Sequence, residues 1–248
     1  MSRQLEHKRA LVTGGSRGIG AAIVTRLAQD GADVALTYVS RADQAEATAQ
    51  AARALGARAF AIQADSADAG AVVAAVERTV IELGGIDILV NNAGIGVMAP
   101  IERFRLEDFD RTVAVNLRAV FVATQAALTH MKSGGRIINI GSCNADRMPF
   151  AGGAVYAMSK AALVGLVKGL ARDVGARGIT VNNVEPGPID TEMNPAGSDF
   201  AERLRTQVLA LPRYGTADEV AAMVAYLAGP EASYVTGASL AIDGGFTA

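Results

Sequence analysis

The chain of 248 residues is half hydrophobic and 19% charged, with a formal net charge of -2. This composition excludes an intrinsically disordered chain, the near-neutral charge argues against a nucleic-acid polymer as partner, and the length suits one domain over residues 1–248. One cysteine, Cys143, and two distant histidines, His7 and His130, exclude an internal disulfide and predict no metal site.

Short apolar runs alternate with longer alanine-rich runs along the chain. The apolar runs predict strands at 10–13, 34–38, 59–62, 86–90, 136–140, 180–184 and 239–242. The alanine-rich runs predict helices at 18–30, 42–55, 69–83, 106–131, 155–176 and 217–227. Because the strands are apolar almost throughout, they suit a parallel sheet that is covered on both faces. We therefore expect an α/β fold with a doubly wound parallel sheet of about seven strands and helices on both faces.

No stretch of the chain predicts a membrane segment. The first eight residues lack the apolar stretch of a signal peptide. The apolar run 161–167, between Lys160 and Lys168, is too short to cross a bilayer. We expect a cytoplasmic protein without a membrane partner.

A glycine-rich turn follows the first predicted strand. Gly14, Gly18 and Gly20 have the spacing Gly-x3-Gly-x-Gly and lead into a predicted helix. Glycines let the backbone approach an anion, and a helix N-terminus presents free N–H groups and the positive end of its dipole. The turn predicts a phosphate-binding site, with a glycine turn that binds nothing as the alternative.

Two residues with acid–base chemistry share a predicted helix face. Tyr156 and Lys160 are four positions apart, and a nearby ammonium group lowers the pKa of a phenol. Such a tyrosine can exchange protons near neutral pH, although an amphipathic helix with a solvated lysine would give the same spacing. Ser142 and the run Asn91–Gly94 follow predicted strands, so both should lie at the carboxyl edge of the sheet, where ligands bind. Asn116 lies inside an apolar helix, which fits a satisfied core group as well as a functional one.

The segment 186–212 interrupts the alternation of strands and helices. It contains four prolines and two glycines: Pro186, Pro188, Pro195, Pro212, Gly187 and Gly197. Long irregular segments inside a compact domain are usually lids or binding loops. We expect this segment to cover the substrate.

Together these residues resemble the short-chain dehydrogenase/reductase family, in its compact single-domain branch. The matching motifs span almost the whole chain in the order of the family: Thr13-Gly14-x3-Gly18-Ile19-Gly20, Asp65, Asn91-Asn92-Ala93-Gly94, Asn116, Ser142, Tyr156-x3-Lys160, Pro186-Gly187 and Thr191. The resemblance implies a Rossmann-type fold and an enzyme that transfers hydride between a nicotinamide dinucleotide and a carbonyl group.

The resemblance also implies a role for each member of a catalytic tetrad. Tyr156 would be the general acid/base, and Ser142 would hold and polarise the substrate oxygen. Lys160 would bind the nicotinamide ribose and lower the pKa of Tyr156. Asn116 would hold a water that links Lys160 to solvent. The cofactor would carry the hydride, while the protein orients and protonates the substrate.

The end of the second predicted strand favours NADP(H) over NAD(H). Proteins of this fold that prefer NAD place an acidic residue there. In this chain Tyr38 ends the strand, and the next acidic residue after it is Asp43. Ser40, Arg41 and Arg17 suit a 2′-phosphate, because guanidinium groups bind phosphate bidentately. The alternative is that both arginines are solvated surface charges.

The remaining cofactor contacts follow from the resemblance. Asp65, with Ser66 beside it, would meet the adenine, and Ile189 and Thr191 would meet the carboxamide. The whole expected set is Gly14, Ser16, Arg17, Gly18, Ile19, Gly20, Tyr38, Ser40, Arg41, Asp65, Ser66, Asn92, Ala93, Gly94, Tyr156, Lys160, Pro186, Gly187, Ile189 and Thr191.

The sequence leaves two classes of carbonyl compound open as the small-molecule substrate. The glycine turn and the run Asp243–Gly245 resemble those of 3-oxoacyl-carrier-protein reductases. The loop Asn144–Phe150 departs from them and resembles a side branch that includes a cyclic-di-GMP-binding biofilm-dispersal reductase, so a ketone reductase is equally supported. A non-catalytic protein that binds a signalling or regulatory nucleotide is the alternative from another class, and an intact tetrad argues against it.

Assembly and five further residues complete the expectations. The family implies a homotetramer that packs helices 106–131 and 155–176 against copies of themselves. Cys143 is expected to be a small packing residue, and His130 to complete a helix end. Met148, Phe150 and Met193 are expected to line the substrate pocket or the core.

Overall fold

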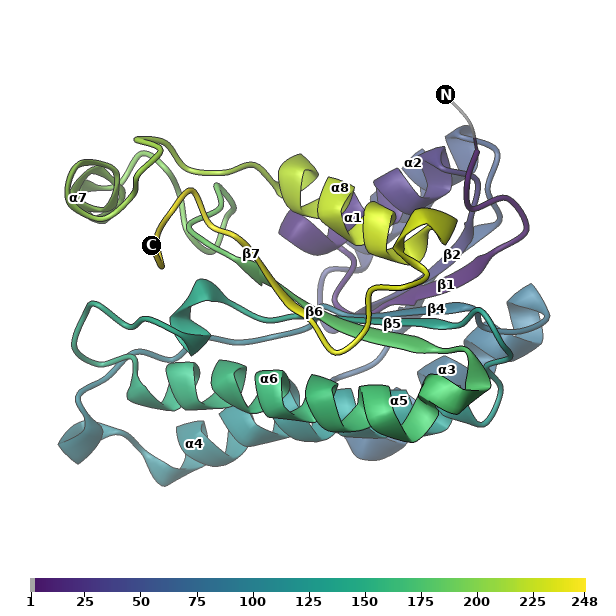
Figure 1. Ribbon diagram of the computed structural model, residues 1–248, viewed down its shortest axis with the longest axis horizontal. Coiled ribbons are helices and arrows are strands. Elements are labelled where there is room, and N and C mark those ends of the chain that lie inside the picture. The colour runs from purple at the N-terminus through teal and green to yellow at the C-terminus, as the bar shows by residue number, and fades with distance from the viewer. Residues whose placement is uncertain (1–2) are drawn as a thin grey trace.

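A seven-stranded parallel sheet forms the centre of the computed structural model, which describes residues 3–248. The strands follow the order β3-β2-β1-β4-β5-β6-β7 (Figure 1). Their bounds are β1 Arg9–Val12, β2 Asp33–Tyr38, β3 Ala59–Gln63, β4 Ile88–Asn91, β5 Arg136–Ile140, β6 Thr180–Pro186 and β7 Ser239–Ile242. The predicted Rossmann-like fold is confirmed, and the order of the strands reverses between β1 and β4.

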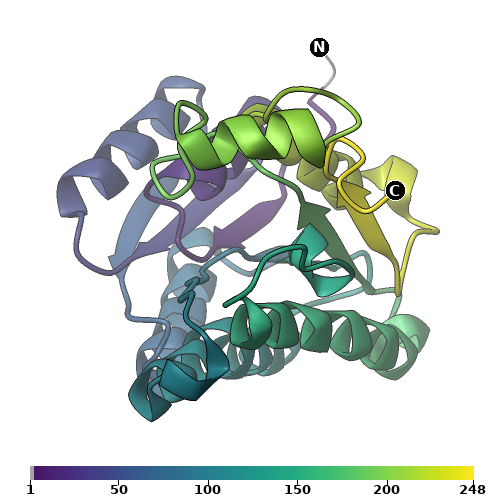
Figure 2. The ribbon, with the colours of Figure 1, turned by 90° about the vertical axis from the view of Figure 1, so that its left-hand side faces the viewer.

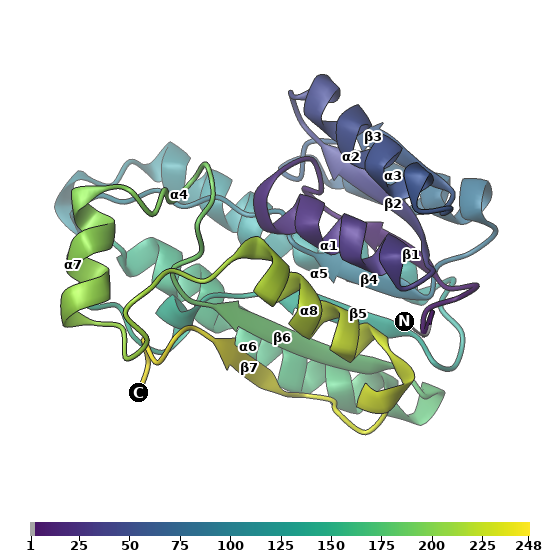
Figure 3. The same cartoon turned by 90° about the horizontal axis from the view of Figure 1, so that it is seen from above.

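Helices cover both faces of the sheet. On one face lie α1 (Gly18–Gln29), α2 (Ala42–Ala54) and α8 (Ala217–Ala228), which Figure 3 shows from above. On the other lie α3 (Ala69–Leu83), α4 (Leu106–Val113), α5 (Ala119–Leu128) and α6 (Ala154–Val174) (Figure 1). The crossovers between parallel strands leave room for these helices, as in other doubly wound sheets.

The inner residues of β1 are apolar because each face of the sheet has its own core. Ala10 and Val12 of β1 pack into the cluster under α1 and α8, whereas Leu11 between them packs into the cluster under α3, α5 and α6. All three side chains are fully buried. β1 pairs with β2 on one side and with β4 on the other, so the strand has no exposed edge.

The predicted helix 106–131 is wrong in one respect, because it is not a single regular helix. A π-helical turn, Ala114–Arg118, separates α4 from α5. In this turn the carbonyl oxygen of Ala114 accepts a hydrogen bond from the N–H of Ala119. Such a turn inserts one residue into the helix and often occurs at a functional site. Asn116 lies in this turn and is buried.

Two further expectations need correction. The segment 186–212 is not irregular throughout, because it contains the helix α7 (Asp199–Gln207). Ser198 is the N-cap of this helix, and its hydroxyl accepts a hydrogen bond from the N–H of Ala201. The side chain of His130 does not complete a helix end. Its Nε2 lies 2.9 Å from Oε1 of Glu77 on α3, because the chain beyond α5 turns toward that neighbouring helix.

One ion pair joins the start of β1 to the segment before β4. Nε of Arg9 donates to Oδ2 of Asp87 at 2.7 Å, and Nη2 donates to Oδ1 at 2.9 Å. The backbone N–H of Arg9 also donates to Oδ2 at 2.9 Å. Although partial burial opposes ionisation, the hydrogen bonds from Arg9 hold the pKa of Asp87 below its ordinary value.

Replacing Asp87 with Asn should lower the free energy of unfolding by about 1–3 kcal/mol near pH 7, since two charge-assisted bonds are lost. A depressed carboxyl pKa stabilises the fold above the unfolded value of about 3.9, and this contribution is lost as the pH falls through the folded value. Urea unfolding should therefore show a smaller difference in the free energy of unfolding between wild type and Asp87→Asn near pH 3 than near pH 7. Glu107→Gln, in an exposed pair with Arg105, is the control and should have almost no effect. An unchanged midpoint for Asp87→Asn near pH 7 would contradict the prediction.

Candidate active site

A cleft of about 730 Å³ runs along the carboxyl edge of the sheet. Figure 2 looks at this edge, with α7 lying across it. Every residue expected to bind the cofactor lines this cleft, as do Ser142, Tyr156 and Lys160. Asn116 is the exception among the expected site residues, because it lies buried behind the cleft.

Gly14 and Gly20 stand where a side chain would be strained or would clash. A Cβ on Gly20 would lie 2.2 Å from the carbonyl oxygen of Gly14, and Gly14 itself has a φ of 65°. Nδ2 of Asn92 donates to the carbonyl oxygens of Thr13 and Gly14, at 2.9 and 3.0 Å, and so ties the turn to the end of β4. Arg17 precedes α1 without a side-chain cap, which leaves the N–H groups of this helix end available to an anion.

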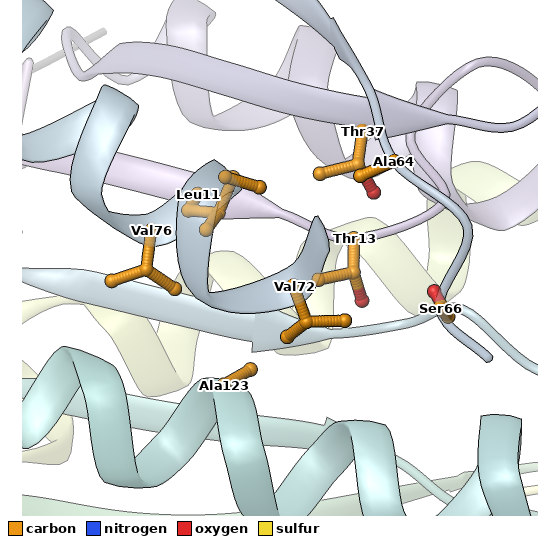
Figure 4. A pocket seen from close by; sticks show the side chains of 9 residues that line it. Leu11, Thr13, Thr37, Ala64, Ser66, Val72, Val76 and Ala123 are labelled. Carbon is orange, nitrogen blue, oxygen red and sulfur yellow. The ribbon is translucent and has the colours of Figure 1, made fainter. Parts of the chain in front are cut away.

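A small cavity lies behind the glycine turn, between the sheet and α3 (Figure 4). Its volume is about 10 Å³, close to the space of one water, and Thr13, Thr37 and Ser66 supply its polar lining. The hydroxyl of Thr13 accepts from the N–H groups of Asn92 and Ala93, both at 3.0 Å. The hydroxyl of Thr37 accepts from the N–H of Gly14 at 3.0 Å. These threonines therefore hold the turn in place, and Thr37 also lines the cleft.

Asn116 links the loop after β4 to α6. Its Oδ1 accepts from the N–H of Ile95 at 2.9 Å, and its Nδ2 donates to the carbonyl of Ile95 at 2.9 Å. The same Nδ2 donates to Oγ of Ser159 at 3.0 Å, and that hydroxyl donates to the carbonyl of Tyr156 at 2.7 Å. Ser159 is fully buried. The sequence did not predict a role for Ser159, although its position between Tyr156 and Lys160 places it next to two expected site residues.

Lys160 is a buried cation at the end of β5. Its Nζ donates to the carbonyl oxygen of Ile140 at 2.8 Å and lies 5.8 Å from the centre of the Tyr156 ring. Burial lowers the pKa of Lys160 to about 8. A Cβ on Gly94 would lie 3.4 Å from this Nζ, so the loop after β4 approaches the ammonium group closely.

The pKa of Tyr156 differs from the sequence-based expectation. Burial raises the pKa of Tyr156 above its ordinary value, and the nearby Ser142 hydroxyl opposes this shift without outweighing it. Nζ of Lys160 donates to Ile140, and burial disfavours the charged form of Lys160 as well, so burial outweighs the lowering expected from Lys160. Ser142 itself donates to Oδ1 of Asn144 at 3.4 Å. The neutral, proton-donating form of Tyr156 is therefore the favoured one.

Charged side chains gather at the end of the cleft formed by β1, β2 and β3. Nη1 of Arg17 lies 3.2 Å from Oε2 of Glu192, and Nε of Arg41 lies 3.5 Å from Oδ1 of Asp43. Arg111 lies 3.8 Å from Asp65. Sequence reasoning missed Glu192 and Arg111, which both line the cleft but come from distant segments.

Apolar side chains gather at the opposite end. The expectation that Met148, Phe150 and Met193 line a pocket agrees with the structure, which adds Met98 and Phe200. Cys143 is buried beside them, and burial raises its pKa to about 12, as expected for an inert packing residue.

Comparisons with known proteins agree with this geometry. A family model described as "Enoyl-(Acyl carrier protein) reductase" matches residues 14–247. The chain is 50% identical to the "Cyclic-di-GMP-binding biofilm dispersal mediator protein" of Escherichia coli K12, over 97% of this chain and 98% of that protein. It is 41% identical to the 3-oxoacyl-[acyl-carrier-protein] reductase of Staphylococcus aureus Mu50, over 96% and 97%. A short chain dehydrogenase from Burkholderia cenocepacia J2315, solved in complex with NADP, superposes with a TM-score of 0.97, 56% identity and coverage of 99% and 100%.

Proposed function

Because the chain belongs to the short-chain dehydrogenase/reductase family of oxidoreductases, we propose that it reduces a ketone or 3-oxoacyl carbonyl to a secondary alcohol with NADPH. The observation that carries this proposal is the convergence of Ser142, Tyr156 and Lys160 on one cleft at the carboxyl edge of the sheet. Two hydroxyl groups and a buried cation at that edge are suited to hold and protonate a carbonyl oxygen.

The residues of the cleft fit a dinucleotide. The absence of a side chain at Gly20 lets the turn pack tightly against Asn92 at the end of β4, and the N–H groups at the uncapped helix end after Arg17 would hold the diphosphate. Lys160 would bind the nicotinamide ribose, and Ile189 and Thr191 would lie against the carboxamide. When bound, NADPH supplies the hydride that reaches the carbonyl carbon.

The protein residues would handle the proton. Ser142 would donate a hydrogen bond to the substrate oxygen, and Tyr156 would transfer its phenolic proton to that oxygen as the alcohol forms. Burial raises the pKa of Tyr156, so near neutral pH the phenol carries the proton that a reduction needs. The charge of Lys160 would stabilise the phenolate that remains, and Asn116 would complete the relay through a water to solvent.

Replacing Tyr156 with Phe should lower kcat by a factor of about 10²–10⁴, because the proton donor is lost. Binding of NADPH should stay nearly unchanged, since the aromatic ring remains. Stopped-flow oxidation of NADPH and fluorescence titration measure the two quantities separately. Full activity of this variant would exclude the proposed role of Tyr156. Absence of turnover in the wild-type protein, with nucleotide binding intact, would favour the alternative of a non-catalytic nucleotide-binding protein; the name of the Escherichia coli relative includes binding of cyclic-di-GMP.

We place the 2′-phosphate of the cofactor at the charged end of the cleft. Arg17, Ser40 and Arg41 face this end, and the strand end at Tyr38 carries no carboxylate for a ribose hydroxyl. Arg17 pairs with Glu192 across the cleft, and a phosphate would take over the guanidinium as its partner. Preference for NADP(H) over NAD(H) follows.

Replacing Arg17 with Ala should raise the dissociation constant of NADPH by about tenfold and that of NADH by less than about twofold, because only NADPH carries the 2′-phosphate. Nicotinamide fluorescence measures both constants. Arg26→Ala, at the other end of α1, removes an arginine that pairs with Asp30 and serves as the matched control. Equal losses for the two dinucleotides would place Arg17 at the diphosphate and not at the 2′-phosphate.

The outer surface of the helices supports a homotetramer in the cytoplasm. Within the described residues, 154–177 is the one helical stretch long and apolar enough to cross a membrane, and it packs on β6 of the sheet. The side chains of Leu106, Phe121 and Met158 are exposed on α4, α5 and α6. Packing of these helices against copies of themselves would bury this apolar surface.

Sedimentation should give a mass near four times 25.5 kDa. Phe121→Asp places a charge on the exposed face of α5 and should shift the mass toward smaller species, since a buried unpaired charge is costly. Arg53→Asp, on the surface of α2, changes the charge elsewhere and should leave the mass as it is. A wild-type monomer would contradict the proposed assembly.

A further inference from the structure

The end of the cleft beside Ser142 and Tyr156 is apolar and uncharged. Met98, Met148, Phe150, Met193 and Phe200 line it, from the loops after β4 and β5 and from segment 186–212. Met98 and Met193 are 59% and 70% exposed in the absence of a substrate. Exposed apolar side chains gathered around a cleft mark a surface that a ligand covers, and methionines adapt to its shape.

The polar groups at this end carry no charge. Beyond Ser142 and Tyr156, the polar lining consists of Asn144, Asn194 and the thiol of Cys143, whose pKa burial raises to about 12. An anionic substrate would need a cation here, because a buried unpaired carboxylate is costly. The charged residues that line the cleft, apart from Lys160, lie at the opposite end with Arg17 and Arg41.

The arginines that border this end are already engaged with aromatic rings. Arg147 lies over Phe246 at 5.9 Å and donates to its carbonyl oxygen at 2.6 Å. Arg203 lies over Phe200 at 5.8 Å. Neither arginine lines the cleft, so neither is placed to neutralise a substrate anion.

An aromatic pair crosses the mouth of the cleft. Phe150 follows β5 and Phe200 lies on α7, and their ring centres are 5.1 Å apart at an interplanar angle of 64°. This edge-to-face arrangement is one of the two that aromatic rings prefer. Both rings are more than a third exposed, so the pair offers its free edges and faces to a ligand.

We propose that the substrate is an uncharged ketone with an aromatic or similarly large apolar substituent, and that the Phe150–Phe200 pair selects it. This inference rests on the proposed function, since it concerns the same cleft and the same proton donor. The substituent lies against the aromatic pair and the methionines, while the carbonyl oxygen points to Ser142 and Tyr156. Small ketones lack the apolar contact, and carboxylate-bearing ketones lack a cation.

The test compares kcat/KM with NADPH for acetophenone, 2-butanone and acetoacetate. The wild-type enzyme should prefer acetophenone to each of the others by at least about tenfold, the discrimination that an apolar pocket gives. Phe200→Leu should lower the ratio of acetophenone to 2-butanone by about threefold to tenfold, which is the contribution of an aromatic pair. The dissociation constant of NADPH should not change in this variant. Phe60→Leu, on β3 outside the cleft, is the matched control and should leave the ratio as in the wild type.

The outcomes separate this inference from the proposed function. Preference for acetoacetate or 2-butanone overturns the inference and leaves the reductase intact. An unchanged ratio in Phe200→Leu, with a wild-type preference for acetophenone, removes the selecting role of the aromatic pair. Binding of NADPH without reduction of these three carbonyls or of a 3-oxoacyl thioester overturns both proposals, whereas reduction of the thioester alone overturns only the inference.

Discussion

The parallel direction of all seven strands is the constraint on which the rest of the molecule depends. In such a sheet every strand ends at the same edge, so loops from distant parts of the sequence meet there. The reversal of strand order between β1 and β4 then opens a cleft at that edge, with the glycine turn on one side and Ser142 on the other. Residues 14 and 246 line the same cleft for this reason.

Burial, more than charge pairing, sets the chemistry of the cleft. It lowers the pKa of Lys160 and raises that of Tyr156, so both groups are pushed toward their neutral forms by the same desolvation. The two ends of the cleft also differ in the charge of the side chains that line them. Arginines and carboxylates gather near β1–β3, where the cleft is exposed, and apolar side chains gather near β5 and α7. The division matches a cofactor with phosphates and a substrate without charge.

The features that were predictable from the sequence depend on local patterns. The apolar runs of β1 and β5 and the glycines of the first turn reflect requirements of backbone geometry and burial, which neighbouring residues reveal. The π turn around Asn116 was not predictable, because contacts with Ile95 and Ser159 stabilise it and these come from other segments. Glu192 and Phe200 were missed because only the tertiary fold brings them opposite Arg17 and Phe150. The sign of the pKa shift at Tyr156 was missed for a similar reason, since burial is a property of the whole fold.

The order of strands has a consequence for how the chain folds. β1 lies near the middle of the sheet, yet Ala10 pairs with Ile88, and β4 must be in place before β1 gains its second neighbour. Closing a loop of this length costs chain entropy before any contact compensates for it, and folds rich in such distant pairings form slowly. During synthesis, β1, β2 and β3 can associate first, but the cleft is incomplete until β6 and the segment after it have emerged. The cleft is therefore completed late in synthesis, although its first glycine is among the earliest residues made.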